Sequence, residues 1–285
     1  MLDPSEFTAW LRAQGGVAHT RTARVAGFSK YDIDVAVLHG AASRVRRSWL
    51  VGPSASPWRH AAASVGGRLT CLSAAAECGL WTPEHQTIHV AVSATASRLE
   101  SAGMRLHYAT GPAPVARTSA TEPILNVLFH IARCVPRLDA LAVWESALNR
   151  KVVDSATLSR VVWRSTAASA LSAAAPALSD SGIETVFREL MASIGVTVRQ
   201  QVWVDGHPLD ALIGDRLGIQ LDGFAHHSSA RDRRRDLRAD ARLVLRGYTI
   251  LRFDYQQVLF DPAYVIETIS MAIAQGLHLA GRPSK

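Results

Sequence analysis

Three oxygen-bearing side chains, those of Asp210, Gln220 and Asp222, lie close enough in the sequence to share one site. Apolar and other residues alternate over Leu217–Asp222, so a half-buried strand would put Gln220 and Asp222 on the same face. Asp205-Gly206 favours a tight hairpin turn, which places Asp210 on a neighbouring strand. Mg²⁺ and Mn²⁺ take oxygen ligands, so the pattern predicts a metal site for phosphodiester chemistry.

A helix, a hairpin, a strand, a second helix and a last strand would position these side chains. Ser181–Gly195 has apolar residues at helical spacing, with Asp180 or Ser181 as its cap and Glu184 in its first turn. An arginine-rich helix and the strand Leu245–Arg252 follow the Asp222 strand. The alternative is that the three polar residues are solvent-facing side chains of a one-sided sheet.

This order of elements resembles the PD-(D/E)XK endonuclease superfamily. Asp222-Gly-Phe-Ala-His-His227 and the helix after it resemble the very-short-patch-repair-endonuclease-like domains within that superfamily. The resemblance extends from Ser181 to near Gln275. It implies that Glu184, Asp210 and Gln220 are the acidic and metal-ligand positions, and that Asp222 stands where the wider superfamily has its lysine.

Gln220 departs from the family pattern, because relatives carry glutamate at this position. A neutral amide removes one negative charge and should weaken a Mg²⁺ site, which Asp222 on the same face could restore. The resemblance also implies that His226 or His227 activates water or protonates the leaving group, a role that suits a pKa near neutrality. The alternative is that both are surface histidines.

The helix after the histidines carries arginine along one face. A wheel places Arg231, Arg235, Arg238, Arg242 and Arg246 on one arc, Asp232, Asp236 and Asp240 on a second, and Ala230, Leu237, Ala241, Val244 and Leu245 on a third, which we expect to be buried. Guanidinium groups bind phosphate oxygens, so Arg231, Arg235, Arg238 and Arg242 are predicted nucleic-acid contacts. Alternatively, the aspartates pair with and orient the arginines.

The amino-terminal segment has the pattern of a winged helix-turn-helix domain. Helices are expected over Ser5–Gln14, Thr20–Gly27 and Ser29–Gly40, followed by a basic β-wing over Ala42–Gly52. In such domains the recognition helix enters the DNA major groove while basic groups around it hold phosphates. The predicted contacts are Ser29, Lys30 and Tyr31 on the third helix and Arg44, Arg46 and Arg47 on the wing.

Three stretches in the first half of the chain resemble the AbiEi-type antitoxin and transcriptional-regulator proteins. They are Arg21–Ser29, the wing ending in Trp49-Leu-Val51, and Leu72–Trp81 followed by Ile88–Val92. The resemblance implies a regulator with a partner toxin or another operon-encoded protein.

Composition limits the class of protein. A net charge of +7 and a pI near 9.8 favour a polyanionic partner such as double-stranded DNA. No apolar run reaches the ~20 residues that span a bilayer and no signal peptide is evident, so a cytoplasmic protein is expected. Cys71, Cys78 and Cys134 form no Cys-x-x-Cys pair and predict no zinc site; Cys71 and Cys78 are expected to be small buried hydrophobes.

We therefore expect an α+β or α/β multidomain protein. The predicted domains are a winged helix over 1–65, a mixed helical and strand connecting domain over 66–164, an Ala/Ser-rich junction over 165–180 and a PD-(D/E)XK restriction-endonuclease-like domain over 181–285. In the connecting domain, helices are expected at 69–80, 122–134, 138–149 and 155–163, and strands at 87–92 and 104–108.

The predicted function is DNA binding coupled to phosphodiester hydrolysis with Mg²⁺ or Mn²⁺. The main alternative is a non-catalytic transcriptional regulator or antitoxin of a defence system in which the nuclease fold has lost catalysis, because Gln220 depletes the expected ligand set. A further alternative makes the carboxy-terminal domain a protein-interaction module.

Overall fold

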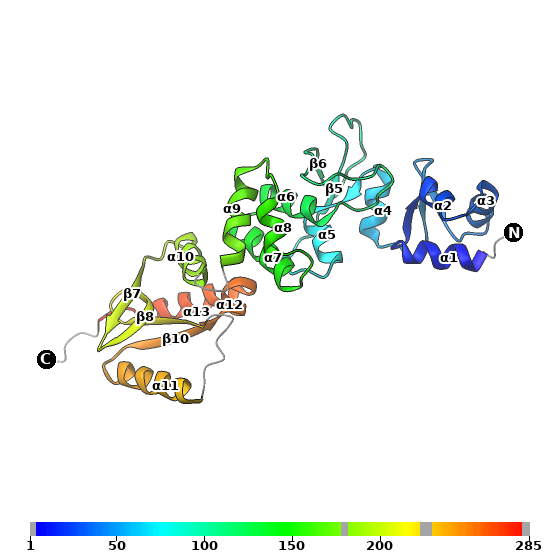
Figure 1. The fold of residues 1–285 in the computed structure, drawn as a ribbon. Coiled ribbons are helices and arrows are strands. Elements are labelled where there is room, and N and C mark those ends of the chain that lie inside the picture. The colour runs from blue at the N-terminus through cyan, green and yellow to red at the C-terminus, as the bar shows by residue number, and fades with distance from the viewer. Residues whose placement is uncertain (1–3, 178–181, 223–229, 281–285) are drawn as a thin grey trace. The chain divides into compact units, whose positions relative to one another are not determined.

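The computed structural model describes residues 4–177, 182–222 and 230–280, and the chain divides into two compact units, Met1–Ser172 and Ala173–Lys285 (Figure 1). His226 and His227 lie outside the described residues, and so do the side chains of Arg231 and Arg235. In the described part of the chain, no helix is long and apolar enough to cross a membrane.

The first unit begins with three helices and a small antiparallel sheet whose strand order is β1-β3-β2. The elements are α1 (Pro4–Ala13), β1 (Val17–His19), α2 (Thr20–Val25), α3 (Lys30–Leu38), β2 (Ser43–Val45) and β3 (Trp49–Val51). Phe7, Trp10 and Phe28 form an aromatic cluster in the core, with the Phe7 and Phe28 ring centroids 5.1 Å apart. The three predicted helices are present, and β2 and β3 form a hairpin in the segment where a wing was predicted, which we call the wing; β1 is an additional strand.

The capping of α3 follows directly from its sequence. The Ser29 hydroxyl accepts a hydrogen bond from the Asp32 backbone N–H at 3.1 Å, and the Asp32 carboxylate accepts one from the Ser29 backbone N–H at 2.9 Å. This reciprocal capping box satisfies two backbone donors at the helix start. Ser29 therefore caps α3.

The rest of the first unit surrounds a second three-stranded sheet, ordered β4-β5-β6, in which β4 is antiparallel and β6 parallel to β5. Its elements are α4 (Pro57–Ser64), β4 (Arg68–Leu69), α5 (Cys71–Glu77), β5 (Ile88–Ala91), β6 (Met104–His107), α6 (Ile124–Cys134), α7 (Arg137–Asn149) and α8 (Ser155–Arg160). The predicted helices and strands are present, with bounds shifted by a few residues. The short elements α4 and β4 were not predicted.

The Ala/Ser-rich segment is more ordered than a junction of low charge suggests. It forms the helix α9 (Thr166–Ala174) and the 3₁₀ turn η1 (Ala175–Ala177), and the boundary between the two units falls inside α9. Alanine has the highest helix propensity, and the helix stops just before Pro176, which cannot continue it.

The second unit has one four-stranded sheet, ordered β10-β9-β8-β7, in which β7, β8 and β9 are antiparallel and β10 runs parallel to β9. Figure 1 shows α11 on one side of the sheet and α10, α12 and α13 on the other. The elements are α10 (Ile183–Ser193), β7 (Val198–Val204), β8 (His207–Ile213), β9 (Leu217–Asp222), α11 (Ala230–Leu245), β10 (Thr249–Asp254), α12 (Tyr255–Phe260) and α13 (Pro262–Ala274). Asp205 and Gly206 both have positive φ in the predicted hairpin turn.

The predicted buried face of α11 is wrong. Leu237, Val244 and Leu245 are 61%, 56% and 88% exposed, whereas Leu243 is 1% exposed and packs with Leu209 and Leu212 of the sheet. A helical wheel shows which residues share a face, but the packing of the sheet decides which face is buried.

Candidate nuclease site

Asp210 lies where strands β8 and β9 stop pairing. Their register runs from Ile213↔Leu217 to Ala211↔Ile219. Beyond the last pair, the Asp210 carboxylate accepts a hydrogen bond from the Leu221 backbone N–H at 2.8 Å. The side chain thus crosses to the next strand and is fixed there, in a partly buried position.

The charges of two further carboxylates, Glu184 and Asp222, influence the pKa of Asp210. Burial is the largest cause that raises the pKa of Asp210, and the negative charges of Glu184 and Asp222 raise it further. The Leu221 N–H and the positive charge of Arg252 oppose them. The structure therefore brings together three of the predicted site residues, one each from α10, β8 and β9, in an arrangement that disfavours a further negative charge and favours a cation.

Gln220 faces its neighbour strand through its amide nitrogen. Nε2 donates to the Pro208 carbonyl at 3.0 Å and lies 3.3 Å from His207 Nε2, and the residue is 8% exposed. A carboxylate could not donate to that carbonyl, so this contact is a local structural reason for an amide at this position. Asp210 and Gln220 are the next residues along β8 and β9 after the last pair, Ala211↔Ile219, but the Gln220 amide nitrogen donates to Pro208 of β8.

Gln201 belongs to the site and was not predicted. It lies on β7 between Gln200↔Ala211 and Val202↔Leu209, opposite Asp210, and its φ is 52°. Its Nε2 donates to both carboxylate oxygens of Glu184 at 3.0 Å. A left-handed backbone costs a non-glycine residue about 1–2 kcal/mol, and such strain concentrates at functional sites.

Arg252 is a second residue that the sequence did not single out. It pairs with Gln220 in the parallel register of β10 and β9. Its guanidinium donates to Asp222 at 3.1 Å and to Asp240 of α11 at 3.0 Å. Arg252 therefore connects α11 to the carboxylates, and Asp240 pairs with this strand residue rather than orienting the helix arginines.

The arginines of α11 that the structure describes have separate environments. Arg246 forms an ion pair with Asp205 at 2.8 Å, whereas Arg238 and Arg242 are exposed. The predicted pairing of aspartate and arginine rows is absent among the described side chains of this helix. Arg238 and Arg242 are therefore accessible to a phosphate.

Replacing Arg252 with alanine should destabilise the second unit. Asp222 and Asp240 would lose their cation, and among the residues that the structure describes none forms a hydrogen bond with the buried Asp240 Oδ1. Because Arg252 is about one-third exposed, the expected loss in unfolding free energy is about 1 kcal/mol. Urea denaturation would measure it beside Arg242→Ala, which should stay within about 0.5 kcal/mol of wild type; equal losses would contradict the bridging role.

The predicted DNA contacts of the first unit differ in availability. Ser29 Oγ donates to Asp32 Oδ2 at 2.6 Å and is committed to the helix cap, whereas Lys30 and Tyr31 are exposed. Arg44 pairs with Asp34 of α3 at 2.6 Å and also donates to the Arg47 carbonyl. Arg44 thus fastens the wing to α3.

Arg46 and Arg47 form the tip of the wing. Both are exposed, and both have positive φ, 46° and 64°. The loop between Val45 and Trp49, which pair across the hairpin, therefore holds two arginines in a backbone conformation that glycine adopts at lower cost.

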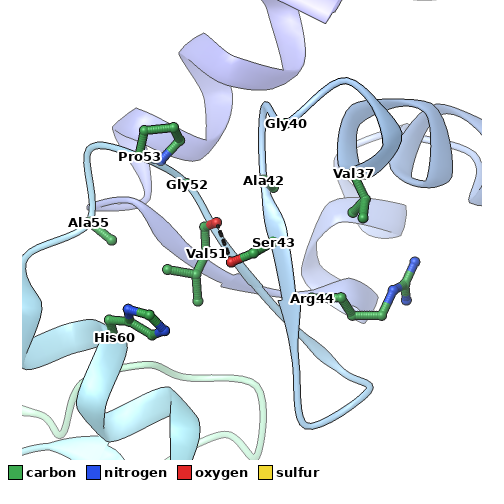
Figure 2. A pocket seen from close by; sticks show the side chains of 10 residues that line it. All are labelled: Val37, Gly40, Ala42, Ser43, Arg44, Val51, Gly52, Pro53, Ala55 and His60. Atoms are coloured by element: carbon green, nitrogen blue, oxygen red, sulfur yellow. Dashed lines mark hydrogen bonds between the residues drawn. The ribbon is translucent and has the colours of Figure 1, made fainter.

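A hollow of 680 Å³ lies between α3, the wing and α4 (Figure 2). Its polar side chains are those of Ser43, Arg44 and His60, and the Ser43 hydroxyl donates to the Val51 carbonyl at 3.3 Å. The lining consists of Val37, Gly40, Ala42, Ser43, Arg44, Val51, Gly52, Pro53, Ala55 and His60. The other lining residues are small or apolar, and none of the residues named is a carboxylate.

Comparisons with known proteins locate a restriction-endonuclease-like region in the second unit. Residues 183–273 match the model of the family REase_MTES_1575. Among solved structures, the catalytic domain of the homing endonuclease I-Bth0305I matches at 19% identity, covering 33% of this chain and 90% of that one, with a TM-score of 0.26. No curated protein matches. The resemblance of the first half to AbiEi-type proteins is without support from these matches.

Proposed function

We propose that the restriction-endonuclease-like region at residues 183–273 is a metal-dependent endonuclease that hydrolyses phosphodiester bonds in DNA. The observation that carries this proposal is that Asp210 is partly buried beside the carboxylates of Glu184 and Asp222: burial raises the pKa of Asp210 most, and the two negative charges raise it further. Nucleases of this kind are typically metal-dependent, and three carboxylates match the oxygen ligands that Mg²⁺ and Mn²⁺ prefer.

The donor set fits such an ion. Glu184 is held by Gln201, Asp210 by the Leu221 N–H, and Asp222 by Arg252. An ionised carboxylate has about four lone-pair sites, so each retains acceptor capacity for a cation. A bound ion would lower the pKa of an attacking water and stabilise the charge that develops on the phosphate.

The surrounding residues orient the ligands. Gln201 of β7 holds the Glu184 carboxylate, Arg252 of β10 holds that of Asp222, and the Leu221 N–H holds that of Asp210. Gln220 contributes a neutral amide, so the cluster has one carboxylate fewer than the glutamate-containing pattern. We also propose that His226 or His227 activates the attacking water or protonates the leaving group.

Exposed basic side chains would bind the DNA backbone. Arg238 and Arg242 on α11 are in the same unit as the carboxylate cluster, and Arg252 connects this helix to Asp222. Guanidinium groups bind phosphate in a bidentate manner, and each neutralised phosphate releases counterions. We therefore propose α11 as the element that holds the substrate strand.

The amino-terminal part supports DNA binding as a second function. Its order α1-β1-α2-α3-β2-β3, with α3 next to a short hairpin, is the arrangement expected of a winged helix. In that arrangement Lys30 and Tyr31 at the start of α3 would face the major groove, and Arg46 and Arg47 would contact phosphates. A regulator without catalysis would keep this activity alone.

Replacing both Arg46 and Arg47 with glycine should separate DNA binding from stability. Glycine relieves the positive-φ strain but increases the entropy of the unfolded chain, so unfolding free energy should be unchanged or about 1 kcal/mol higher. Log affinity decreases with log salt concentration, and the magnitude of this negative slope should be smaller by about 2, one for each lost phosphate contact. Fluorescence anisotropy at several salt concentrations measures this slope.

Arg98→Gly is the matched control, because Arg98 is an exposed arginine with a φ of 53° outside the wing. It should reproduce the stability effect and leave the salt slope unchanged. An unchanged slope in the wing variant would remove these two arginines from the DNA contact.

A cleavage assay tests the nuclease proposal. Supercoiled and single-stranded DNA would be incubated with the full chain and Mg²⁺ or Mn²⁺, beside Asp210→Ala and the exposed control Asp215→Asn. We expect cleavage by wild type and the control and none by Asp210→Ala. DNA binding without cleavage by any of the three proteins would favour the non-catalytic regulator, and equal cleavage by Asp210→Ala would place the activity elsewhere.

A further inference from the structure

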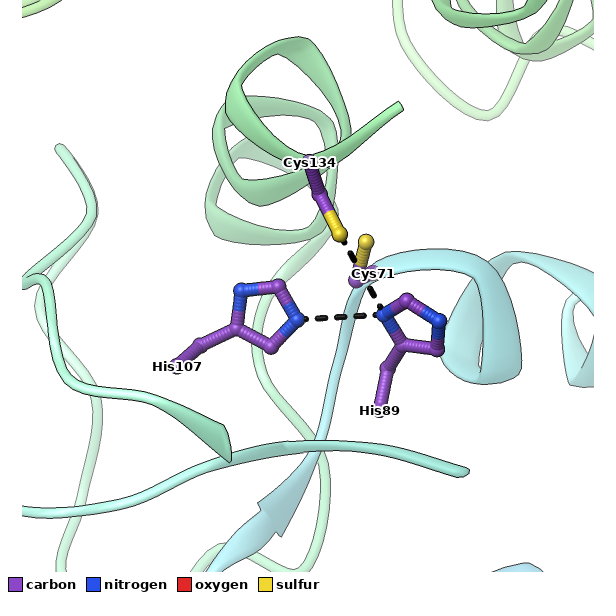
Figure 3. A group of neighbouring side chains, drawn as sticks. All are labelled: Cys71, His89, His107 and Cys134. Atoms are coloured by element: carbon purple, nitrogen blue, oxygen red, sulfur yellow. Dashed lines mark hydrogen bonds between the residues drawn. The ribbon is translucent and has the colours of Figure 1, made fainter. Parts of the chain in front are cut away.

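Two cysteines and two histidines come together in the first unit, although nothing in their sequence spacing indicates a site. Cys71 begins α5, His89 lies on β5, His107 ends β6 and Cys134 ends α6 (Figure 3). One potential ligand atom from each of the four lies within 4.8 Å of the other three. Cys71 and His89 are buried, and the other two are partly buried.

The contacts of His89 are more numerous than one ring nitrogen can satisfy. Its Nδ1 lies 3.1 Å from His107 Nε2 and 3.6 Å from Cys134 Sγ. A ring nitrogen carries either one proton or one lone pair, so it can serve one of these partners at a time. A metal ion at the centre of the group would accept a lone pair from every member.

The distances agree with tetrahedral coordination. Zinc–nitrogen bonds of about 2.0–2.1 Å and zinc–sulfur bonds of about 2.3 Å imply nitrogen–nitrogen edges of roughly 3.3 Å and nitrogen–sulfur edges of roughly 3.6 Å. The observed separations of 3.1 Å and 3.6 Å lie close to these edges.

The backbone holds the four residues in this arrangement. His89 and His107 project from neighbouring parallel strands, and the Ser73 hydroxyl accepts the His89 backbone N–H at 3.0 Å. Cys71 has a φ of 51°, which costs a non-glycine residue about 1–2 kcal/mol. Strain of this kind persists where the surrounding structure, or a ligand, compensates for it.

Further imidazoles border the group. The rings of His107 and His130 have centroids 4.8 Å apart, and those of His85 and His89 are 5.9 Å apart. Nε2 of His130 and of His85 is buried without a hydrogen-bond partner in the described part of the chain. The region is thus rich in nitrogen donors that the protein's own hydrogen bonds do not use.

We propose that Cys71, His89, His107 and Cys134 bind one Zn²⁺ ion. Two thiolates and two imidazoles are a preferred ligand set for zinc, and four protein ligands complete its tetrahedral shell, which is the pattern of structural rather than catalytic sites. The ion would join α5, β5, β6 and α6 around a sheet whose strands have two to four residues. Its role is to stabilise this part of the first unit.

Metal content of the full-length protein tests the proposal. After extensive dialysis, elemental analysis should find one zinc per chain, and Cys134→Ser and His107→Ala should each lose it. Cys78→Ser is the matched control, because Cys78 is a free cysteine outside the group. Asp210→Ala should also keep the zinc, so failure of the nuclease proposal leaves this result unaffected.

Cobalt substitution identifies the ligands independently of stability. A Co²⁺-loaded protein should show the visible bands of a tetrahedral ion and thiolate charge-transfer absorption, both retained in Cys78→Ser and lost in Cys134→Ser. Chelation should also lower the melting temperature of wild type and not that of Cys134→Ser. Substoichiometric zinc with no thiolate absorption would overturn the proposal, as would a Cys71–Cys134 disulfide in freshly purified protein.

Discussion

Asp210→Asn should stabilise the metal-free protein and abolish its cleavage of DNA. Burial and the charges of Glu184 and Asp222 raise the pKa of Asp210, so ionising this carboxyl costs folding free energy. The amide is neutral and nearly isosteric. Loss of this proposed metal ligand should reduce the cleavage rate by at least about a hundredfold, because a metal ion supplies several kcal/mol of transition-state stabilisation.

The stability effect has a defined pH dependence. With a folded pKa above its ordinary value of 3.8, Asp210 contributes stability that is fully present below that value and is lost as pH rises through the raised pKa. The advantage of Asp210→Asn over wild type should therefore grow with rising pH across this window and then level off. Thermal unfolding in chelator at several pH values measures it, and Asp215→Asn should show no such trend.

Adding Mg²⁺ should make wild type more stable than Asp210→Asn, which is the reverse of their order without metal. The ion should raise the melting temperature of wild type, since a ligand that binds the folded state stabilises it, and should leave that of Asp210→Asn unchanged. Equal stabilisation of both proteins would show that the ion binds away from Asp210.

Gln220→Glu should strengthen metal binding and weaken the metal-free fold. One more negative charge beside the cation should increase Mg²⁺ affinity about ten- to a hundredfold, after desolvation is allowed for. Without metal, the new carboxylate would face the Pro208 carbonyl in place of a hydrogen bond, at a cost of about 1–3 kcal/mol. Isothermal titration and urea denaturation measure the two effects.

Two variants delimit this prediction. Gln275→Glu changes an exposed glutamine on the same unit and should alter neither quantity. A leucine side chain has no ligand atom, so Gln220→Leu should reduce Mg²⁺ affinity only if the Gln220 amide oxygen is itself a ligand. Unchanged affinity in Gln220→Glu would exclude Gln220 from the metal site.

The local framework of the candidate nuclease site was predictable because short-range patterns determine it. Alternation over Leu217–Asp222 and the Asp205-Gly206 turn depend on residues close in sequence, and β9 and the hairpin form where these patterns predict them. Glu184 was predicted as a site residue only because of the resemblance to the endonuclease superfamily. Its approach to Asp210 depends on how α10 packs against the sheet.

Residues brought in by long-range pairing were not predictable. Arg252 meets Asp222 because β10 is parallel to β9 in one particular register, and a shift of one residue would turn Arg252 to the other face. Gln201 looked like an ordinary strand residue. The Cys71 group was missed for the same reason, since its four members come from four elements that meet only in the folded unit.

The most direct test of the proposed metal-dependent nuclease centre is to measure Mn²⁺ binding and DNA cleavage on the same samples of wild type, Asp210→Asn and Asp215→Asn. Titration at constant ionic strength should show binding and cleavage rising together in wild type and in Asp215→Asn, and neither in Asp210→Asn at the same concentrations. Cleavage that proceeds in Asp210→Asn, or wild-type Mn²⁺ binding without any cleavage, would contradict the account.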